Sequence, residues 1–181
     1  MIRRTAVLVS LAIWLAALAV ASHAAVVWLD VPFVKQEKNA CGAASISMVM
    51  RYWAQQQGKT AGQEADAPTI FRQLYSEKAH GIFASDLQRY LEEHDFRVFA
   101  FHGAWDDLSQ HIAKGRPLIV SLAESGRNGP LHYVVVVGLD GNEQLVMVND
   151  PANRKLLKMH WREFEHGWSL TEHWTLLALP R

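Results

Sequence analysis

Cys41 is the only cysteine among the 181 residues of the chain. A single thiol cannot form an internal disulfide or complete a thiolate metal cluster, so any role of Cys41 rests on its own reactivity. Asn39 is a favourable helix cap and the apolar run from Ile46 to Trp53 follows, which places the sulfur in the first turn of a predicted helix. That position lowers the pKa of a thiol and favours the nucleophilic thiolate.

A catalytic thiolate needs a base and a group that orients the base. His132 is the candidate base because it lies between a loop, residues 124–130, and the buried β-branched run Tyr133–Leu139. Asp150 is the candidate orienting group, since it ends the next apolar run directly before a proline, which cannot continue a ladder. If the turn signal Asp140-Gly141 joins the two strands, His132 and Asp150 lie at the same end of a hairpin.

Each of these residues also has a purely structural interpretation. A lone cysteine is often a small buried hydrophobe, a histidine that starts a strand is often a polar end group, and an aspartate before proline is often a turn residue. The small residues Gly42–Ala44 leave room for another backbone beside the sulfur, and the amide of Gln36 could donate to an oxyanion. The agreement of turn, strand lengths and residue types favours a reactive site.

The remaining patterns predict no cofactor, metal or nucleic acid. The segment Gly58-Lys59-Thr60 lacks the first glycine of a phosphate-binding loop and follows a helix instead of a strand. The spacing of His160, His166 and His173 fits no zinc site, and no cysteine is left to join them. A formal net charge of zero without a basic stripe argues against a nucleic-acid partner.

Residues 1–24 have the layout of a secretory signal peptide. A cationic start precedes an apolar run from Ala6 to Ala21, and small residues at the end suit cleavage after Ala24. The alternative is an uncleaved anchor over residues 5–21 in the inner membrane, which would be the only membrane contact. Both alternatives predict an exported protein, periplasmic or secreted, with a single domain over residues 25–181.

The body of the chain changes from helical to β-rich patterning. Helices are predicted over residues 41–57, ended by Gly58, over 66–78, and over 85–94 with a capping box of Ser85 and Gln88. Strands and short helices follow: strands over 97–101, 117–123, 133–139, 144–149 and 174–179, and helices over 105–114 and 161–167. Helices first and a mostly antiparallel sheet second predict an α+β domain.

These motifs, taken in order, resemble a known family: the bacteriocin-processing, double-glycine-leader cysteine peptidases and their stand-alone relatives, of the papain-like superfamily. The resemblance covers residues 29–152. It is carried by Val31–Phe33, Gln36, Cys41–Ser45, His132–Gly138 and Asn149–Ala152, with further likeness over residues 81–87 and 114–120. It implies a papain-like fold, with the helical N-terminal half packed on a mostly antiparallel sheet.

The resemblance also assigns roles: Cys41 as nucleophile, His132 as base, Asp150 as its orienting group and Gln36 as oxyanion donor. The implied function is cleavage of a peptide or protein substrate, with a Gly-Gly pair before the cut as the family preference, and a separate export system as a partner. Ala40 departs from the acidic residue that many members carry before the cysteine. Two alternatives stay open: another acyl transfer by the same thiol, and a non-catalytic peptide-binding domain.

Overall fold

The computed structural model describes residues 26–123 and 131–181. The predicted signal peptide, residues 1–24, and the loop before His132, residues 124–130, lie outside the described residues. Within the described part of the chain, no helix combines the length and the apolar character needed to cross a membrane.

The first half of the described chain is helical, as predicted. Helix α2 spans Cys41–Gln56, a 3-10 turn spans Gln63–Ala65, α3 spans Ala67–Leu74 and α4 spans Ala84–Glu93. The end of α2 is also as predicted, because Gly58 takes the left-handed conformation, with φ of 67°, that a glycine adopts at little cost just after a helix.

Three local predictions in this half are wrong. Asn39 does not cap α2: the cap position is Ala40 without a side-chain bond, and Asn39 has φ of 61°, a turn conformation that asparagine tolerates. Ser85 lies inside α4, whose cap position is Phe83, so no capping box forms. Helix α3 ends at Leu74 instead of residue 78, because the chain turns extended at the next residue and Ser76 pairs with Gly81.

The second half forms a seven-stranded sheet in which every described pairing is antiparallel. The strands are β1 (Val27–Trp28), β2 (Phe96–His102), β3 (Leu118–Ala123), β4 (Leu131–Asp140), β5 (Leu145–Asn149), β6 (Leu157–His160) and β7 (Trp174–Pro180). The order is β2-β7-β3-β4-β5-β6, with β1 paired to β4. Strand β6 was not predicted, because Leu157–His160 mixes apolar and charged residues over only four positions.

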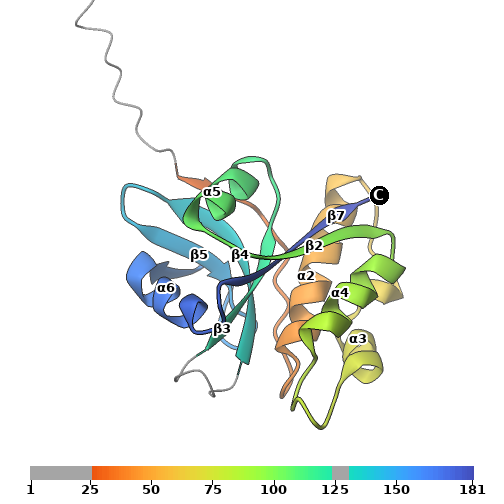
Figure 1. Cartoon of the computed structure of the whole chain (residues 1–181). Helices are drawn as coiled ribbons and strands as arrows, with labels where there is room; N and C mark the ends of the chain where they lie inside the picture. Colours follow the sequence, from red (N-terminus) through yellow and green to blue (C-terminus); the bar gives the residue numbers. More distant parts are fainter. Residues whose placement is uncertain (1–25, 124–130) are drawn as a thin grey trace, which may run out of the picture.

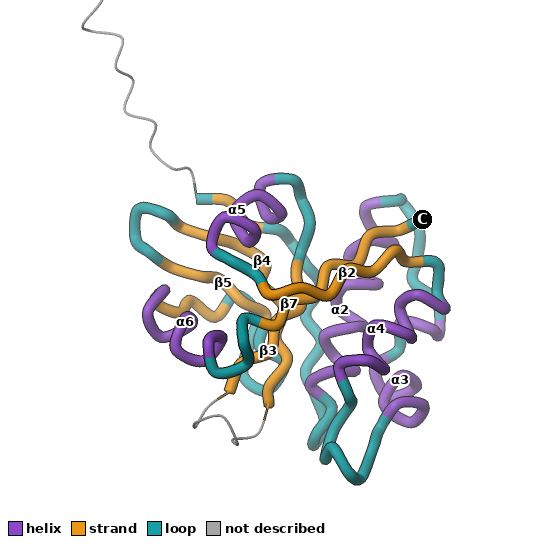
Figure 2. Tube along the Cα trace, in the orientation of Figure 1, coloured by secondary structure: helices purple, strands orange, loops and turns teal. Residues whose placement is uncertain are grey.

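Helices lie on both sides of the sheet. Helices α2, α3 and α4 gather in one half of the molecule, and α5 (Trp105–Ala113) and α6 (Trp161–Ser169) pack on the other (Figures 1 and 2). Strand β4 lies between the two groups. Its residues Tyr133, Val135 and Val137 belong to the core shared with α2, whereas Val134 and Val136 belong to the core shared with α5 and α6. The uninterrupted β-branched run of β4 therefore reflects burial on both faces.

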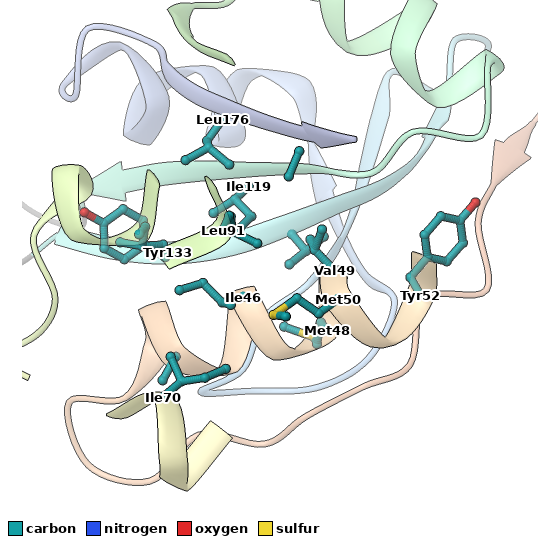
Figure 3. Close-up of a cluster of buried hydrophobic side chains, with 14 of the residues drawn as sticks. Ile46, Met48, Val49, Met50, Tyr52, Ile70, Leu91, Ile119, Tyr133 and Leu176 are labelled. Atoms are coloured by element: carbon teal, nitrogen blue, oxygen red, sulfur yellow. The ribbon is translucent and has the colours of Figure 1, made fainter. Parts of the chain in front are cut away.

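The core beneath α2 fixes the start of this helix against the sheet. Figure 3 shows Ile46 and Val49 of α2 facing Ile119 and Leu176 of the sheet, and all four side chains are buried. Burying four such aliphatic side chains stabilises this contact by several kcal/mol, about 1.5–3 kcal/mol each. The rigid contact sets where Cys41, the first residue of α2, lies relative to β4.

Candidate active site

The β4–β5 hairpin brings His132 and Asp150 together. His132 is the second residue of β4, Asp150 follows the last residue of β5, and the register pairs Val135 with Asn149. Nε2 of His132 lies 2.8 Å from Oδ1 of Asp150, and the two side chains are only 16% and 9% exposed. The hairpin argument from the sequence predicted this proximity.

The carboxylate of Asp150 is held by several donors. The backbone N–H of Ala152 donates to Oδ1 at 2.9 Å, and the side chain of Asn153 donates to Oδ2 at 2.6 Å. Burial acts to raise the pKa of Asp150, but the bonds from His132, Asn153 and Ala152 outweigh it and lower this pKa to about 2. Asp150 therefore carries a negative charge at neutral pH.

Cys41 is the first residue of α2 and is half-buried. Burial acts to raise the pKa of its thiol, but a hydrogen bond with His132 and backbone hydrogen bonds from Tyr133 and Gly42 together hold this pKa below its usual range. The sulfur also lies at the positive end of the α2 dipole, which favours the same charge state. The thiolate is thus stabilised from both the helix and the sheet.

His132 connects the sulfur to the carboxylate. Its Nε2 is taken by Asp150, so its Nδ1 is the ring nitrogen left for Cys41. Burial acts to lower the pKa of His132, but the hydrogen bonds to Asp150 and Cys41 prevail and raise it to about 9. The lowered pKa of Cys41 and the raised pKa of His132 both favour transfer of the thiol proton to the imidazole.

Gln36 and Cys41 line one cavity of about 730 Å³, here called the thiol cavity. Its other walls come mainly from residues 79–83 before α4, from the first residue of α4, and from Leu131, His132 and Tyr133 of β4. The Oε1 atom of Gln36, an acceptor, is buried without a hydrogen-bond partner among the described residues. The side chain lines the same cavity as the sulfur, where its Nε2–H group could serve as a donor. The backbone N–H of Gln36 donates to Pro151 O at 2.9 Å, which ties it to the turn after Asp150.

Two residues at this site were not singled out from the sequence. Asn153 holds Asp150, and a signal for it exists: an asparagine three residues after an aspartate in a proline-containing turn can bond back to the carboxylate. Tyr133 lines the thiol cavity and supplies a backbone N–H to the sulfur. No sequence signal marks that second role, because it depends on where α2 docks on β4.

The histidines that were weighed as metal ligands do not come together in one group. His173 bonds Glu165 at 2.8 Å. His160, before α6, and His166, in its last turn, are exposed, and His166 lines a cavity that His132 and Asp150 also line. Among the described residues, no three His, Cys, Asp or Glu side chains come together in a group that could hold a metal ion.

Fold and site together define a class: the papain-like cysteine peptidases, with the helix that starts at the cysteine packed on an antiparallel sheet that carries the histidine. A family model described as the peptidase C39-like family matches residues 28–175. The chain therefore belongs to the peptidase C39-like family and is a cysteine peptidase that acts on peptide substrates.

Solved structures with the same fold include three peptidases. A C39-like peptidase from Bacillus anthracis has a TM-score of 0.67 at 17% identity, covering 87% of this chain and 98% of its own. The peptidase domain of Streptococcus ComA, a bifunctional ABC transporter, has a TM-score of 0.63 at 18% identity. The match covers 82% of this chain and 98% of that domain. A double-glycine motif protease from an AMS/PCAT transporter, solved with a leader peptide, has a TM-score of 0.63 at 20% identity. The match covers 85% of this chain and 94% of that protease. No curated protein sequence matches the chain.

Proposed function

We propose that the chain hydrolyses a peptide bond with Cys41 as nucleophile, His132 as acid and base, Asp150 as the group that orients His132, and Gln36 as an oxyanion donor. The observation that carries this proposal is the continuous series of hydrogen bonds from Cys41 through His132 to Asp150. A structural cysteine would need neither a lowered pKa nor a charged partner.

The chemistry follows from the positions of these groups. The Cys41 thiolate attacks the carbonyl carbon and forms a C–S bond, while the carbonyl electron pair moves to oxygen and is stabilised by the Gln36 amide and the Cys41 N–H. The C–N bond then breaks, and the imidazolium of His132 protonates the leaving amine. Water, losing a proton to His132, hydrolyses the thioester and restores the thiolate–imidazolium pair.

A second part of the proposal is that the substrate carries small residues, such as Gly-Gly, before the cut. The wall of the thiol cavity beside Cys41 is made by Tyr133 and Ile82, both buried. These two side chains are packed tightly on the start of α2, since a Cβ atom on Gly42 would meet them at 3.3–3.4 Å. Ile82 and Tyr133 therefore form a fixed wall beside the sulfur, which favours a small substrate residue there. The neighbour solved with a leader peptide is a double-glycine motif protease, which supports the same preference.

Peptides that differ only before the cleaved bond test this preference. Changing either glycine of a Gly-Gly pair to alanine is expected to lower kcat/KM by about tenfold, the cost of pressing one added methyl group against the fixed wall of Ile82 and Tyr133. The variant Ile82→Ala, which opens the wall, is expected to reduce this discrimination. The matched variant Phe83→Ala, at an exposed side chain of the same cavity, should keep it. Equal cleavage of all peptides would contradict the preference.

Alkylation of Cys41 against pH tests the thiolate directly and needs no substrate. At about pH 6 the wild-type thiol is expected to react with iodoacetamide at least about tenfold faster than in His132→Ala, because an unassisted thiol has a pKa of about 8.5. The control His160→Ala removes an exposed histidine far from the sulfur in the fold and should leave the rate unchanged. Identical rates in wild type and His132→Ala would refute the catalytic role of the pair.

Export stays a prediction of the sequence. If residues 1–24 act as a signal peptide, the substrate is met in the periplasm or outside the cell, and bacteriocin-type leader peptides are one class of substrate consistent with the family.

A further inference from the structure

Asn149, the last residue of β5, is fully buried and bonds two segments that lie far from each other in the chain. Its Nδ2–H group donates to the carbonyl oxygen of Val31 at 3.1 Å, and its Oδ1 atom accepts from the backbone N–H of Leu156 at 3.0 Å. A carbonyl oxygen needs a donor and an N–H group needs an acceptor, and a side-chain amide supplies both. Both polar atoms of the Asn149 amide are therefore used to hold these segments together.

Each of the two segments carries a residue of the active site. Residues 31–36, here called the oxyanion arm, end at Gln36, and residues 150–156, here called the Asp150 turn, begin at Asp150. The oxyanion arm follows β1 and runs between the helical half and the sheet (Figure 1). At its far end, the backbone N–H of Gln36 donates to the carbonyl oxygen of Pro151 at 2.9 Å. The arm is thus bonded at both ends to the region around Asp150.

The two segments differ in how much they depend on Asn149. The Asp150 turn has bonds of its own, since the N–H of Asp150 donates to the carbonyl oxygen of Arg154 at 3.1 Å. The N–H of Asn153 likewise donates to the carbonyl oxygen of Asp150 at 3.1 Å. The oxyanion arm contains no helix or strand, and bonds to other segments hold its two ends. Loss of the Asn149 amide is therefore expected to displace the arm more than the turn.

Resting on the proposed function, we propose that Asn149 is a positioning residue that holds the amide of Gln36 in place for the oxyanion formed beside Cys41. An oxyanion donor acts only if it lies within about 3 Å of the oxygen that becomes charged. A displacement of about 1 Å lowers the rate by about 10²-fold. Asn149 does not line the thiol cavity, so it acts through the oxyanion arm and not on the substrate itself.

The variant Asn149→Ala tests this role when it is combined with Gln36→Ala. Alone, Asn149→Ala is expected to lower kcat by about 30-fold with KM changed little, because the Gln36 amide is displaced from the transition state. In a chain that already carries Gln36→Ala, the same substitution should lower kcat by no more than about twofold, since the donor is already absent. The measurement is turnover of a nitroanilide of a blocked Gly-Gly peptide, with thermal unfolding to verify that each variant is folded.

Alkylation of Cys41 separates this role from a loss of stability. The hydrogen bonds from Cys41 through His132 to Asp150 do not involve the oxyanion arm. The rate of reaction with iodoacetamide against pH should therefore be the same in Asn149→Ala and wild type. General loosening at the end of β5 would instead move Asp150 and change this profile.

Lys155→Gln is the matched control. Lys155, in the Asp150 turn, forms an exposed ion pair with Asp30, which directly precedes the oxyanion arm. The control thus removes another bond between the same two parts of the chain. Because exposed ion pairs contribute little to stability, kcat of Lys155→Gln should stay within about twofold of wild type.

A second variant keeps the test decisive if Asn149→Ala does not fold. The hydroxyl of Asn149→Ser can still bond one of the two partners, so we expect a loss in kcat of about fivefold that also disappears in the Gln36→Ala background. Equal losses in both backgrounds, a changed alkylation profile, or wild-type kcat in a folded variant would overturn the proposal. Unfolding of both variants would overturn it too, since Asn149 would then serve only the stability of the domain. If Gln36→Ala alone kept full turnover, the oxyanion role in the proposed function would fail, and this inference with it.

Discussion

Replacing Asp150 by alanine is expected to lower kcat/KM by about 10³-fold, because His132 loses the partner that fixes its tautomer and stabilises its positive charge. Asp150→Asn should fall between wild type and alanine, since an amide oxygen can still accept from Nε2 but carries no charge. The same substitution at the opposite end of the hairpin, Asp140→Asn, is the matched control: Asp140 accepts turn N–H groups and is far from His132 in the hairpin. It should leave kcat/KM nearly unchanged.

The pH profile distinguishes positioning from a merely structural role for Asp150. In the wild type, kcat/KM should fall on the alkaline side near pH 9, where His132 loses its proton. Asp150→Asn removes the charge that raises the pKa of His132, so this limb should move to lower pH. The acid limb should move to higher pH. An imidazole with a lower pKa holds its proton less firmly, so it stabilises the Cys41 thiolate less and the pKa of Cys41 rises. An unfolded variant, or a profile that keeps both limbs, would mark Asp150 as a structural residue only.

Replacing Gln36 by alanine is expected to lower kcat by about 10²–10³-fold with KM changed little, since an oxyanion donor acts mainly in the transition state. Gln36→Glu should not restore the rate, because it keeps the size of the side chain but replaces the donor by a negative charge. Lys35→Ala, at the exposed neighbouring residue, is the control and should behave as wild type.

A second measurement separates oxyanion stabilisation from damage to the nucleophile. Gln36 contributes nothing to the pKa of Cys41, which is set by burial, His132, Tyr133 and Gly42. The alkylation rate of Cys41 against pH should therefore be the same in Gln36→Ala and wild type. A slowed alkylation, or a loss confined to KM, would exclude Gln36 as an oxyanion donor.

The fold could be predicted from the sequence where the spacing of apolar residues and the turn-forming residues indicate the same element. The uninterrupted apolar run of β4 and the turn after Asp140 defined a hairpin, and the hairpin alone brought His132 and Asp150 within reach. The order of helices before strands likewise predicted the α+β class. Local helix starts were less predictable: Asn39 and Ser85 have the side chains of caps, but the chain path around the thiol cavity places them elsewhere.

Contacts between segments distant in the chain could not be predicted from the sequence. The backbone N–H of Tyr133 that supports the sulfur depends on how α2 docks on β4, and neither element encodes that docking alone. Strand β6 is a similar case, because its four residues form a strand only through pairing with β5. Such tertiary arrangements follow from packing over the whole domain, and no local pattern reports them.

The imidazole and the carboxylate share one local hairpin, whereas the sulfur arrives from a helix remote in sequence. Short-range contacts form early and cheaply during folding, and long-range ones must wait for loop closure. In an unfolded or partly folded chain, the Cys41 thiol should therefore react like an ordinary cysteine. The reactive pair is therefore expected only once α2 has docked on β4, so an incompletely folded chain should not cut its neighbours.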